Sequence, residues 1–193
     1  MMSADGLHFN NAVSGFPLCC PFRGSLLTSR YPHKCVPGHE FQMPEEQKTI
    51  AHVFNRNGYK TAYFGKWHVD GFKETDGRAA FHIIPPERRG GFDTWMGYEN
   101  NNSQWDSWIH GGEGTEQFHY RLPGYETDCL TDLLIDYIEK NATPQEADPF
   151  FAVLSVQPPH DPYVAPEEYM RRHNPADIQL RPNVPDVKRI VET

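Results

Sequence analysis

The stretch Pro149-Phe150-Phe151-Ala152-Val153-Leu154-Ser155-Val156 is an almost unbroken apolar run, and Gln157-Pro158-Pro159-His160 follows it directly. A run of this length without alternation is typical of a strand that is buried on both faces of a parallel sheet. Parallel strands need long crossovers, which are usually helices. The stretch therefore predicts an α/β fold, provided that helical segments accompany it.

Helical patterns and a second strand do precede this run. Residues 59–64 predict a short strand, which ends at Gly65-Lys66-Trp67-His68. Three helices are expected, at residues 23–28 with Pro21 in the first turn, at 44–57 with the stripe Ile50, Val53 and Phe54, and at 129–140 with the apolar face Leu130, Leu133, Leu134, Tyr137 and Ile138.

The remaining segments have no helical or strand period. Residues 6–13 are expected to begin as a short extended segment, and residues 70–126 are expected to be irregular. Residues 174–193 are polar and interrupted by proline, as in a linker or loop. We therefore expect a domain over residues 1–173, followed by a proline-rich loop over 174–193.

Two polar segments follow the two predicted strands. Lys66 and His68 come after the first strand, and His160 comes after the second. In open α/β sheets, ligands bind beyond the carboxyl ends of the strands. We therefore expect both segments to face the same crevice.

Composition narrows the class of protein. The chain of 193 residues has a formal net charge of −8, which argues against a nucleic-acid partner. It contains no apolar stretch long enough to cross a membrane, and its first residues do not resemble a signal peptide. The four cysteines form no CxxC pair, so a zinc site is not expected; a Cys35–Cys129 bridge is left open.

A cysteine stands just before the first predicted helix. Cys19 follows the loop Ser14-Gly15-Phe16-Pro17, and the backbone N–H groups and dipole of a helix start favour an anion at such a place. Arg23, four residues later, can turn back toward the same point. The pair suits a nucleophile acting on an anionic substrate; the structural alternative is a small buried side chain.

The run Cys19-Cys20-Pro21-Phe22-Arg23-Gly24-Ser25-Leu26-Leu27-Thr28-Ser29-Arg30 resembles the cysteine signature of the sulfatase family. The core Cys-x-Pro-x-Arg is intact, whereas Phe22 replaces the usual Ser and Ser29 the usual Gly. Gly65-Lys66-Trp67-His68 resembles the family's Gly-Lys-Trp-His segment. Gln157-Pro158-Pro159-His160-Asp161-Pro162 is similar to its Pro-His-x-Pro segment. The three segments occur in the family's order.

The resemblance implies a fold, a modification and a set of roles. The fold is a partial alkaline-phosphatase-like α/β fold with a mostly parallel sheet flanked by helices. A maturation enzyme converts Cys19, rather than Cys20, to formylglycine, and a divalent metal, Ca²⁺ or Mg²⁺, assists sulfate-ester hydrolysis. Arg23 steadies the nucleophile, Lys66 and His68 bind it or the sulfate, and His160 gives a proton to the leaving oxygen.

The implied metal site has only Cys19, as formylglycine, among its ligands in this chain. The family's Asp-Asp pair on a first strand and its later Asp-Asn pair and Lys have no match, and Asp93 and Asp161 lie outside those positions. We therefore expect the first strand and the C-terminal part of the fold to be missing. We also expect weak metal binding and little sulfatase activity from this chain.

The substrate is expected to be a sulfated small molecule or glycan. Ring and amide side chains between residues 92 and 125 suit a sugar: Trp95, Tyr98, Asn100, Asn101, Asn102, Trp105, Trp108, His110, His119 and Tyr120. An aromatic-pinned structural loop is the alternative. Three other functions stay open: a phosphonate or phosphate monoester hydrolase, a non-catalytic anion-binding module, and a thiol enzyme that pairs Cys19 with His33 or His68.

Overall fold

The computed structural model describes residues 2–142 and 148–184, so the last residues of the expected 174–193 loop lie outside the described residues. It divides into one unit of Met1–Tyr163 and another of Val164–Thr193. The second unit has a one-turn helix, α4 (Glu167–Met170), and a 3-10 turn, Pro175–Asp177. The domain boundary expected at residue 173 stays a prediction.

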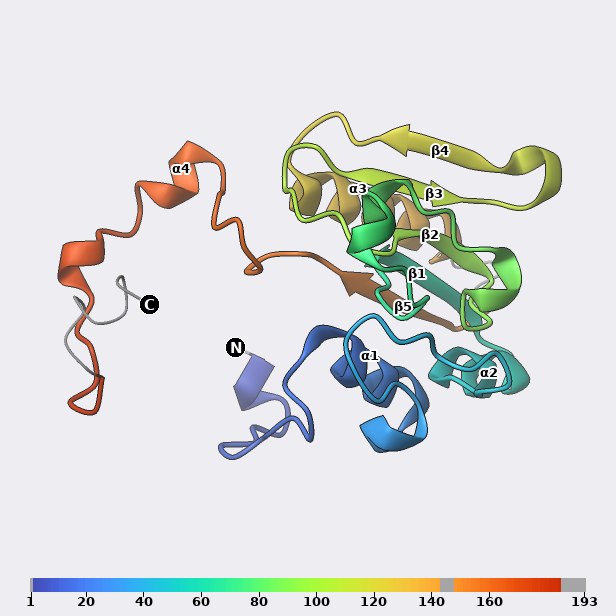
Figure 1. Cartoon of the computed structure of the whole chain (residues 1–193), viewed down its shortest axis with the longest axis horizontal. Coiled ribbons are helices and arrows are strands. Elements are labelled where there is room, and N and C mark those ends of the chain that lie inside the picture. The colour runs from blue at the N-terminus through green and yellow to red at the C-terminus, as the bar shows by residue number, and fades with distance from the viewer. Residues whose placement is uncertain (1, 143–147, 185–193) are drawn as a thin grey trace. The chain divides into compact units, whose positions relative to one another are not determined.

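A five-stranded sheet forms the centre of the first unit (Figure 1). The strands, in the order β4-β3-β2-β1-β5, are β1 (Lys60–Lys66), β2 (Thr94–Tyr98), β3 (Trp108–Gly111), β4 (Phe118–Arg121) and β5 (Phe150–Ser155). Strands β2 and β5 both pair with β1 in parallel, whereas β3 and β4 continue the sheet as an antiparallel hairpin. The expected α/β class is confirmed, and the two predicted strands, β1 and β5, pair with each other in parallel.

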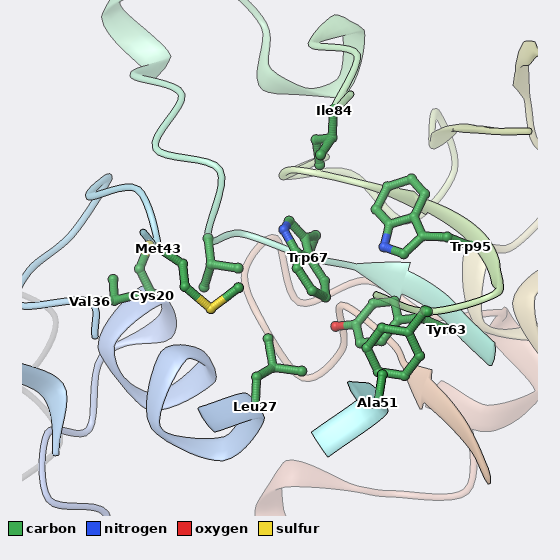
Figure 2. Packing of buried hydrophobic residues seen from close by; sticks show 11 residues of the cluster. Cys20, Leu27, Val36, Met43, Ala51, Tyr63, Trp67, Ile84 and Trp95 are labelled. Atoms are coloured by element: carbon green, nitrogen blue, oxygen red, sulfur yellow. The ribbon is translucent and has the colours of Figure 1, made fainter. Parts of the chain in front are cut away.

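Helices pack on both faces of the sheet, as parallel strands require. On one face, α1 (Cys19–Thr28) and α2 (Ile50–Arg56) cover Tyr63 and Trp95 (Figure 2). On the other face, α3 (Glu126–Asn141) covers Ala62 and Phe64 through Tyr137. Successive residues of β1 therefore point to opposite helical layers, which explains why this strand has no exposed face.

The helices start at different residues from those expected. Helix α1 begins at Cys19, which places Pro21 in its first turn. Helix α2 begins at Ile50 and not at Pro44, because Thr49 and His52 form a reciprocal capping box at that point. Val53, expected in the buried stripe, is 46% exposed, while Phe54 stacks on Phe151 at 4.2 Å between ring centroids.

The region 70–126, expected to be irregular, contains three strands. β2, β3 and β4 have only four or five residues each and carry Gly97 and Gly111, so no clear period develops. Residues 6–13, expected to begin as an extended segment, have no strand partner within the described chain and are exposed. Their side chains find no neighbours that would fix a strand.

Strand β5 is parallel, as predicted, but it is not fully buried. It lies at the edge of the described sheet, and all six of its residues have intermediate exposure. No helix in the described part of the chain is both long and apolar enough to span a membrane. All four cysteines are free, so the Cys35–Cys129 bridge left open by the sequence is not formed.

Candidate active site

The two adjacent cysteines differ sharply in exposure. Cys19 is the first residue of α1 and is partly exposed, whereas Cys20 is 1% exposed and belongs to the core cluster. Burial raises the pKa of the Cys20 thiol to about 11. Cys19 is therefore the more accessible of the two thiols, and its role as the nucleophile stays a prediction.

Arg23 ties α1 to the ends of two strands. Its Nη1 donates hydrogen bonds to the backbone oxygen of Lys66 (2.7 Å), to Ser155 Oγ (2.7 Å) and to Tyr63 Oη (3.4 Å). Tyr63 Oη and Ser155 Oγ also donate to the same Lys66 oxygen, at 2.5 and 3.0 Å. The three bonds that Arg23 donates all use Nη1, so its Nε and Nη2 have no hydrogen-bond partner among the described residues.

Lys66 is the last residue of β1 and is 2% exposed. Burial, followed by the nearby charge of Arg23, lowers the pKa of its amine to about 8. The cysteines 19 and 20 act on the same pKa in the opposite direction, which places Lys66 beside the start of α1. A buried ammonium next to a guanidinium favours an anion as its partner.

His68 follows two residues later and is also 2% exposed. Burial, and then the positive charges of Lys66, Arg23, His39 and His160, lower its pKa to about 2. Its backbone φ is +54°, which is unusual for a residue other than glycine and is typical of functional sites. His68 is therefore a neutral imidazole held inside a cationic cluster.

His160 comes from the loop after β5 and reaches the same cluster, since its charge acts on the pKa of His68. Its Nδ1 donates to the backbone oxygen of Asp161 at 2.7 Å and lies 3.1 Å from Asp161 Oδ1. Because a carbonyl oxygen only accepts, the contact fixes the proton on Nδ1 and leaves Nε2 for another partner. The ends of β1 and β5 lie side by side, since Ser155 Oγ donates to the Lys66 backbone oxygen at 3.0 Å; that the segments after them face one crevice stays a prediction.

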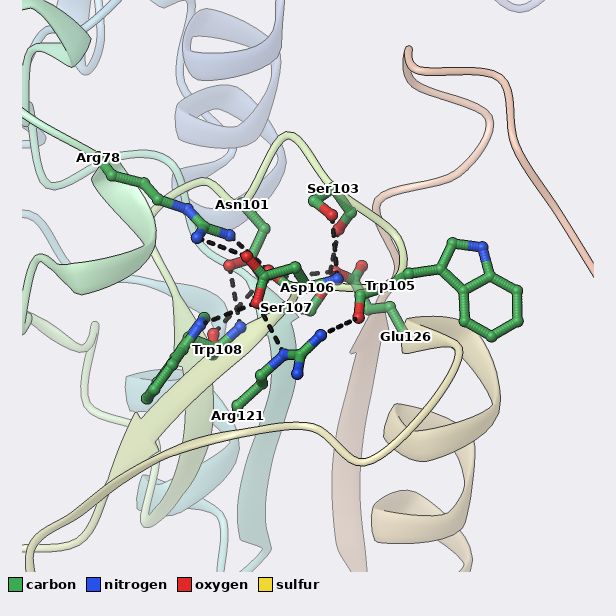
Figure 3. A network of polar contacts seen from close by, with 9 residues as sticks. All are labelled: Arg78, Asn101, Ser103, Trp105, Asp106, Ser107, Trp108, Arg121 and Glu126. Atoms are coloured by element: carbon green, nitrogen blue, oxygen red, sulfur yellow. Dashed lines mark hydrogen bonds and ion pairs between the residues drawn. The ribbon is translucent and has the colours of Figure 1, made fainter.

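A buried carboxylate, Glu126, holds the loops around this crevice. It is fully buried at the start of α3 and accepts from Tyr98 Oη (2.6 Å), Ser107 Oγ (2.6 Å) and the Gln157 backbone (3.1 Å). Asn101 Nδ2 also donates to it at 3.3 Å, and Figure 3 shows Glu126 with Asn101 and Ser107. Glu126 thereby fixes the start of the loop that carries His160, a role the sequence alone did not reveal.

A second buried carboxylate supports the segment that follows His68. Glu99 is 1% exposed and accepts hydrogen bonds from the backbone of Asp70 (2.9 and 3.1 Å) and Gly71 (3.0 Å). Burial, and then the neighbouring Asp70 carboxylate, raise the pKa of Glu99 to about 7. Asp70 in turn pairs with His82 (2.5 Å) and with Arg88 (2.8 Å).

Some of the side chains expected to bind a sugar are buried, and others are exposed. Trp95, Tyr98 and His110 are buried in the core, so stacking on a ligand is excluded for them. Trp105, at 47% exposure, and Tyr120, at 40%, remain on the surface. A surface pocket nearby is lined by Glu74, Arg78 and the amides of residues 100–102.

The residues described do not fit a Ca²⁺ or Mg²⁺ site, since both ions take oxygen ligands. Within residues 2–142 and 148–184, the one group of three His, Cys, Asp or Glu with metal-ligand spacing is Cys20, His39 and His68. Its donors are one sulfur and two nitrogens.

Comparisons with known proteins identify the family of the chain. The family model described as Sulfatase matches residues 1–181. The chain is 34% identical to an ulvan-active sulfatase from Formosa agariphila, over 95% of this chain and 34% of that protein. It is 24% identical to an N-acetylglucosamine-6-sulfatase from Bos taurus, over 85% of this chain and 30% of that one.

A solved structure shows the same fold. The YidJ protein from Bacteroides fragilis superimposes with a TM-score of 0.77 and 26% identity, over 91% of this chain and 41% of that one. The chain spans about a third of the length of the curated relatives named above.

Proposed function

The chain belongs to the sulfatase family, and on this premise we propose that it forms the nucleophile and anion pocket of a sulfuric ester hydrolase. The observation that carries the proposal is the meeting of Arg23, Lys66 and His68 beside Cys19 at the start of α1. A sulfate ester is an anion, and buried cations with a helix N-terminus are suited to neutralise it.

We propose that Cys19 is converted to formylglycine by a maturation enzyme. When present, this aldehyde supplies a hydrated nucleophile that can release sulfate again without leaving a stable ester on the enzyme. The exposure of Cys19 and the intact Cys-x-Pro-x-Arg core support this choice over Cys20. The divalent metal that the family implies would have Cys19, as formylglycine, as its one ligand among the described residues.

The side chains of the pocket have separate roles in this proposal. Arg23 and Lys66 neutralise the sulfate oxygens, and the neutral His68 lies within the same cationic cluster. His160 keeps one proton on Nδ1 through its bond to Asp161, so its Nε2 is the atom that faces the leaving oxygen and gives it a proton when the ring carries a second proton there; the ring then returns to its neutral form. The proposal thus gives a role to each of the five predicted site residues.

The substrate class proposed is a sulfated glycan. The names of the relatives, an ulvan-active sulfatase and an N-acetylglucosamine-6-sulfatase, support a sugar sulfate. The exposed Trp105 offers a ring for stacking, and the pocket with Arg78 and Asn102 offers polar partners. Removing that ring by Trp105→Ala is expected to weaken binding of a sulfated oligosaccharide without changing binding of inorganic sulfate.

The modification is tested by mass spectrometry. The chain is co-expressed with a formylglycine-generating enzyme, and fragment ions of the peptide from residue 17 to 30 locate the change. We expect the Cys19 side chain to become an aldehyde while Cys20 stays a thiol. An unmodified Cys19, alongside full conversion of a known sulfatase in the same cells, would refute the assignment.

The anion pocket is tested by calorimetric titration with inorganic sulfate. Arg23→Met and Lys66→Met are each expected to weaken binding by at least about tenfold, the equivalent of one charge-assisted hydrogen bond. Arg121→Met is the matched control, because Arg121 pairs with Asp106 at the surface. Equal affinity of the unaltered chain and the three variants for sulfate would contradict the proposal. Faster hydrolysis of a phosphate ester than of the matched sulfate ester would favour the phosphatase alternative.

A further inference from the structure

Three side chains with metal-ligand atoms meet beside the anion pocket. Cys20 comes from α1, His39 from the loop before α2, and His68 from the segment after β1. One ligand atom from each lies within 4.8 Å of the others. The Cys20 Sγ is 3.7 Å from His39 Nδ1, and the rings of His39 and His68 are nearly perpendicular, with centroids 5.5 Å apart.

These separations are close to those of a tetrahedral metal centre. Bond lengths of about 2.3 Å to sulfur and about 2.0 Å to nitrogen put two tetrahedral ligand atoms about 3.6 Å apart. The Sγ to Nδ1 distance of 3.7 Å therefore needs almost no adjustment. The third ligand atom lies within 4.8 Å of the other two, so a movement of up to about 1.5 Å completes the arrangement.

An unsatisfied nitrogen points to a missing partner. His68 is 2% exposed, and its Nδ1 has no hydrogen-bond partner among the described residues. A buried polar atom without a partner costs free energy, and such atoms call for an explanation such as an ion. A metal ion bound at this ring would satisfy the nitrogen.

Glu40 forms the outer shell of the cluster. Its backbone N–H donates to Cys20 Sγ at 3.4 Å, and its carboxylate oxygen lies 3.7 Å from His39 Nε2. The same oxygen accepts from the Glu74 backbone at 3.0 Å, which fixes its position. The carboxylate is within ion-pair distance of Nε2, which favours the other ring nitrogen, Nδ1, as the metal ligand.

We propose that Cys20, His39 and His68 bind a thiophilic divalent cation such as Zn²⁺, with a fourth position open to water. One sulfur and two imidazole nitrogens select such an ion over Ca²⁺ or Mg²⁺. On binding, the S–H bond of Cys20 breaks, the S–Zn bond forms, and the proton passes to water. The half-exposed ring of His39 gives the ion its entry from solvent.

The site shares His68 with the anion pocket. If the proposed function holds, an ion at this position withdraws the His68 ring from the sulfate and acts as an inhibitor. Metal binding itself does not depend on that function, so it is measured directly and without an ester substrate.

The experiment is a titration of the metal-free full chain with Co²⁺, followed by displacement with Zn²⁺ against a chromophoric chelator. We expect one equivalent of ion per chain, visible d–d bands typical of four ligands, and a thiolate-to-cobalt absorption in the near ultraviolet. His39→Ala is expected to remove stoichiometric binding. Glu40→Gln, which leaves all three ligands in place, should weaken it by about 10- to 100-fold.

Controls separate this site from other thiols and imidazoles. Cys129→Ser and His33→Ala change residues of the same types elsewhere, and both should bind the ion like the unaltered chain. His39 is at the surface, so His39→Ala keeps the fold, which circular dichroism checks. Absence of binding in the unaltered chain, equal affinity in His39→Ala, or loss of the thiolate band in Cys129→Ser would overturn the proposal.

Discussion

The buried carboxyl of Glu99 makes the stability of the fold depend on pH in a defined window. Glu99 holds the backbone of Asp70 and Gly71, immediately after His68. Burial and the Asp70 carboxylate raise its pKa from 4.5 to about 7. The native state therefore binds this proton more tightly than the unfolded state, and the free energy of unfolding falls as pH rises from about 4.5 to about 7.

The size of the effect follows from the shift. A change of about two and a half pKa units corresponds to about 3 kcal/mol. Glu99→Gln keeps the shape of the side chain and one acceptor oxygen, but it cannot ionise. The free energy of unfolding of this variant therefore lacks the fall with pH that Glu99 causes. We expect the stability of the variant relative to the unaltered chain to increase by about 3 kcal/mol between about pH 4.5 and pH 8.

The assay is urea unfolding followed by tryptophan fluorescence at several pH values. Other titrating groups are common to both proteins and cancel in the difference between them. Glu116→Gln is the matched control, because Glu116 is exposed and should give a curve parallel to that of the unaltered chain. If the curve for Glu99→Gln also stayed parallel, within about 1 kcal/mol, Glu99 would not titrate in this window and the reasoning would be wrong.

Three further substitutions test contacts that shape the crevice. Gly65 has a φ of +104°, and Gly65→Ala places a methyl group against the Ser155 backbone oxygen. The free energy of unfolding in urea should fall by at least about 2 kcal/mol, and a fall of less than about 0.5 kcal/mol would contradict this. Tyr98→Phe removes the 2.6 Å hydrogen bond to the buried Glu126 and should cost about 2 kcal/mol, whereas unchanged stability would mean that water replaces the hydroxyl. Ser155→Ala removes one acceptor of Arg23, so it should lower stability by about 1 kcal/mol and also weaken sulfate binding; an effect on stability alone would show that Arg23 keeps its position without Ser155.

The parts of the fold that the sequence predicted are those with strong local signals. The apolar run of β5 and the segment 59–64 before Gly65 indicated two strands, and the structure pairs them in parallel. The hairpin of β3 and β4 was not predicted, because each strand has four residues and depends on its partner for its conformation. The start of α2 was predicted at Pro44, because proline is common in the first turn of a helix, whereas the capping box of Thr49 and His52 starts the helix at Ile50.

Sequence motifs predicted the residues of the candidate site, but they did not predict the buried glutamates that hold its segments in position. Lys66 and His160 follow strands, so their convergence could be inferred from the rule for parallel sheets. Glu99 and Glu126 carry no such signal, because a glutamate in a loop or at a helix start normally faces solvent. Only the three-dimensional arrangement shows that they are buried and that backbone N–H groups of the site segments donate to them.

The hydrogen bonds of Arg23 also limit how early the segment around Cys19 can reach its final position during synthesis. Arg23 and Ser155 are separated by 132 residues, so their contact cannot exist until the ribosome has made β5. At about 5 to 20 residues per second, roughly 7 to 26 s pass between the synthesis of these two residues. During that interval the segment from Cys19 to Arg23 lacks its final anchor. If the proposed modification of Cys19 takes place on this unanchored segment, slowing translation between residues 30 and 155 would lengthen the interval and raise the fraction of Cys19 that is modified.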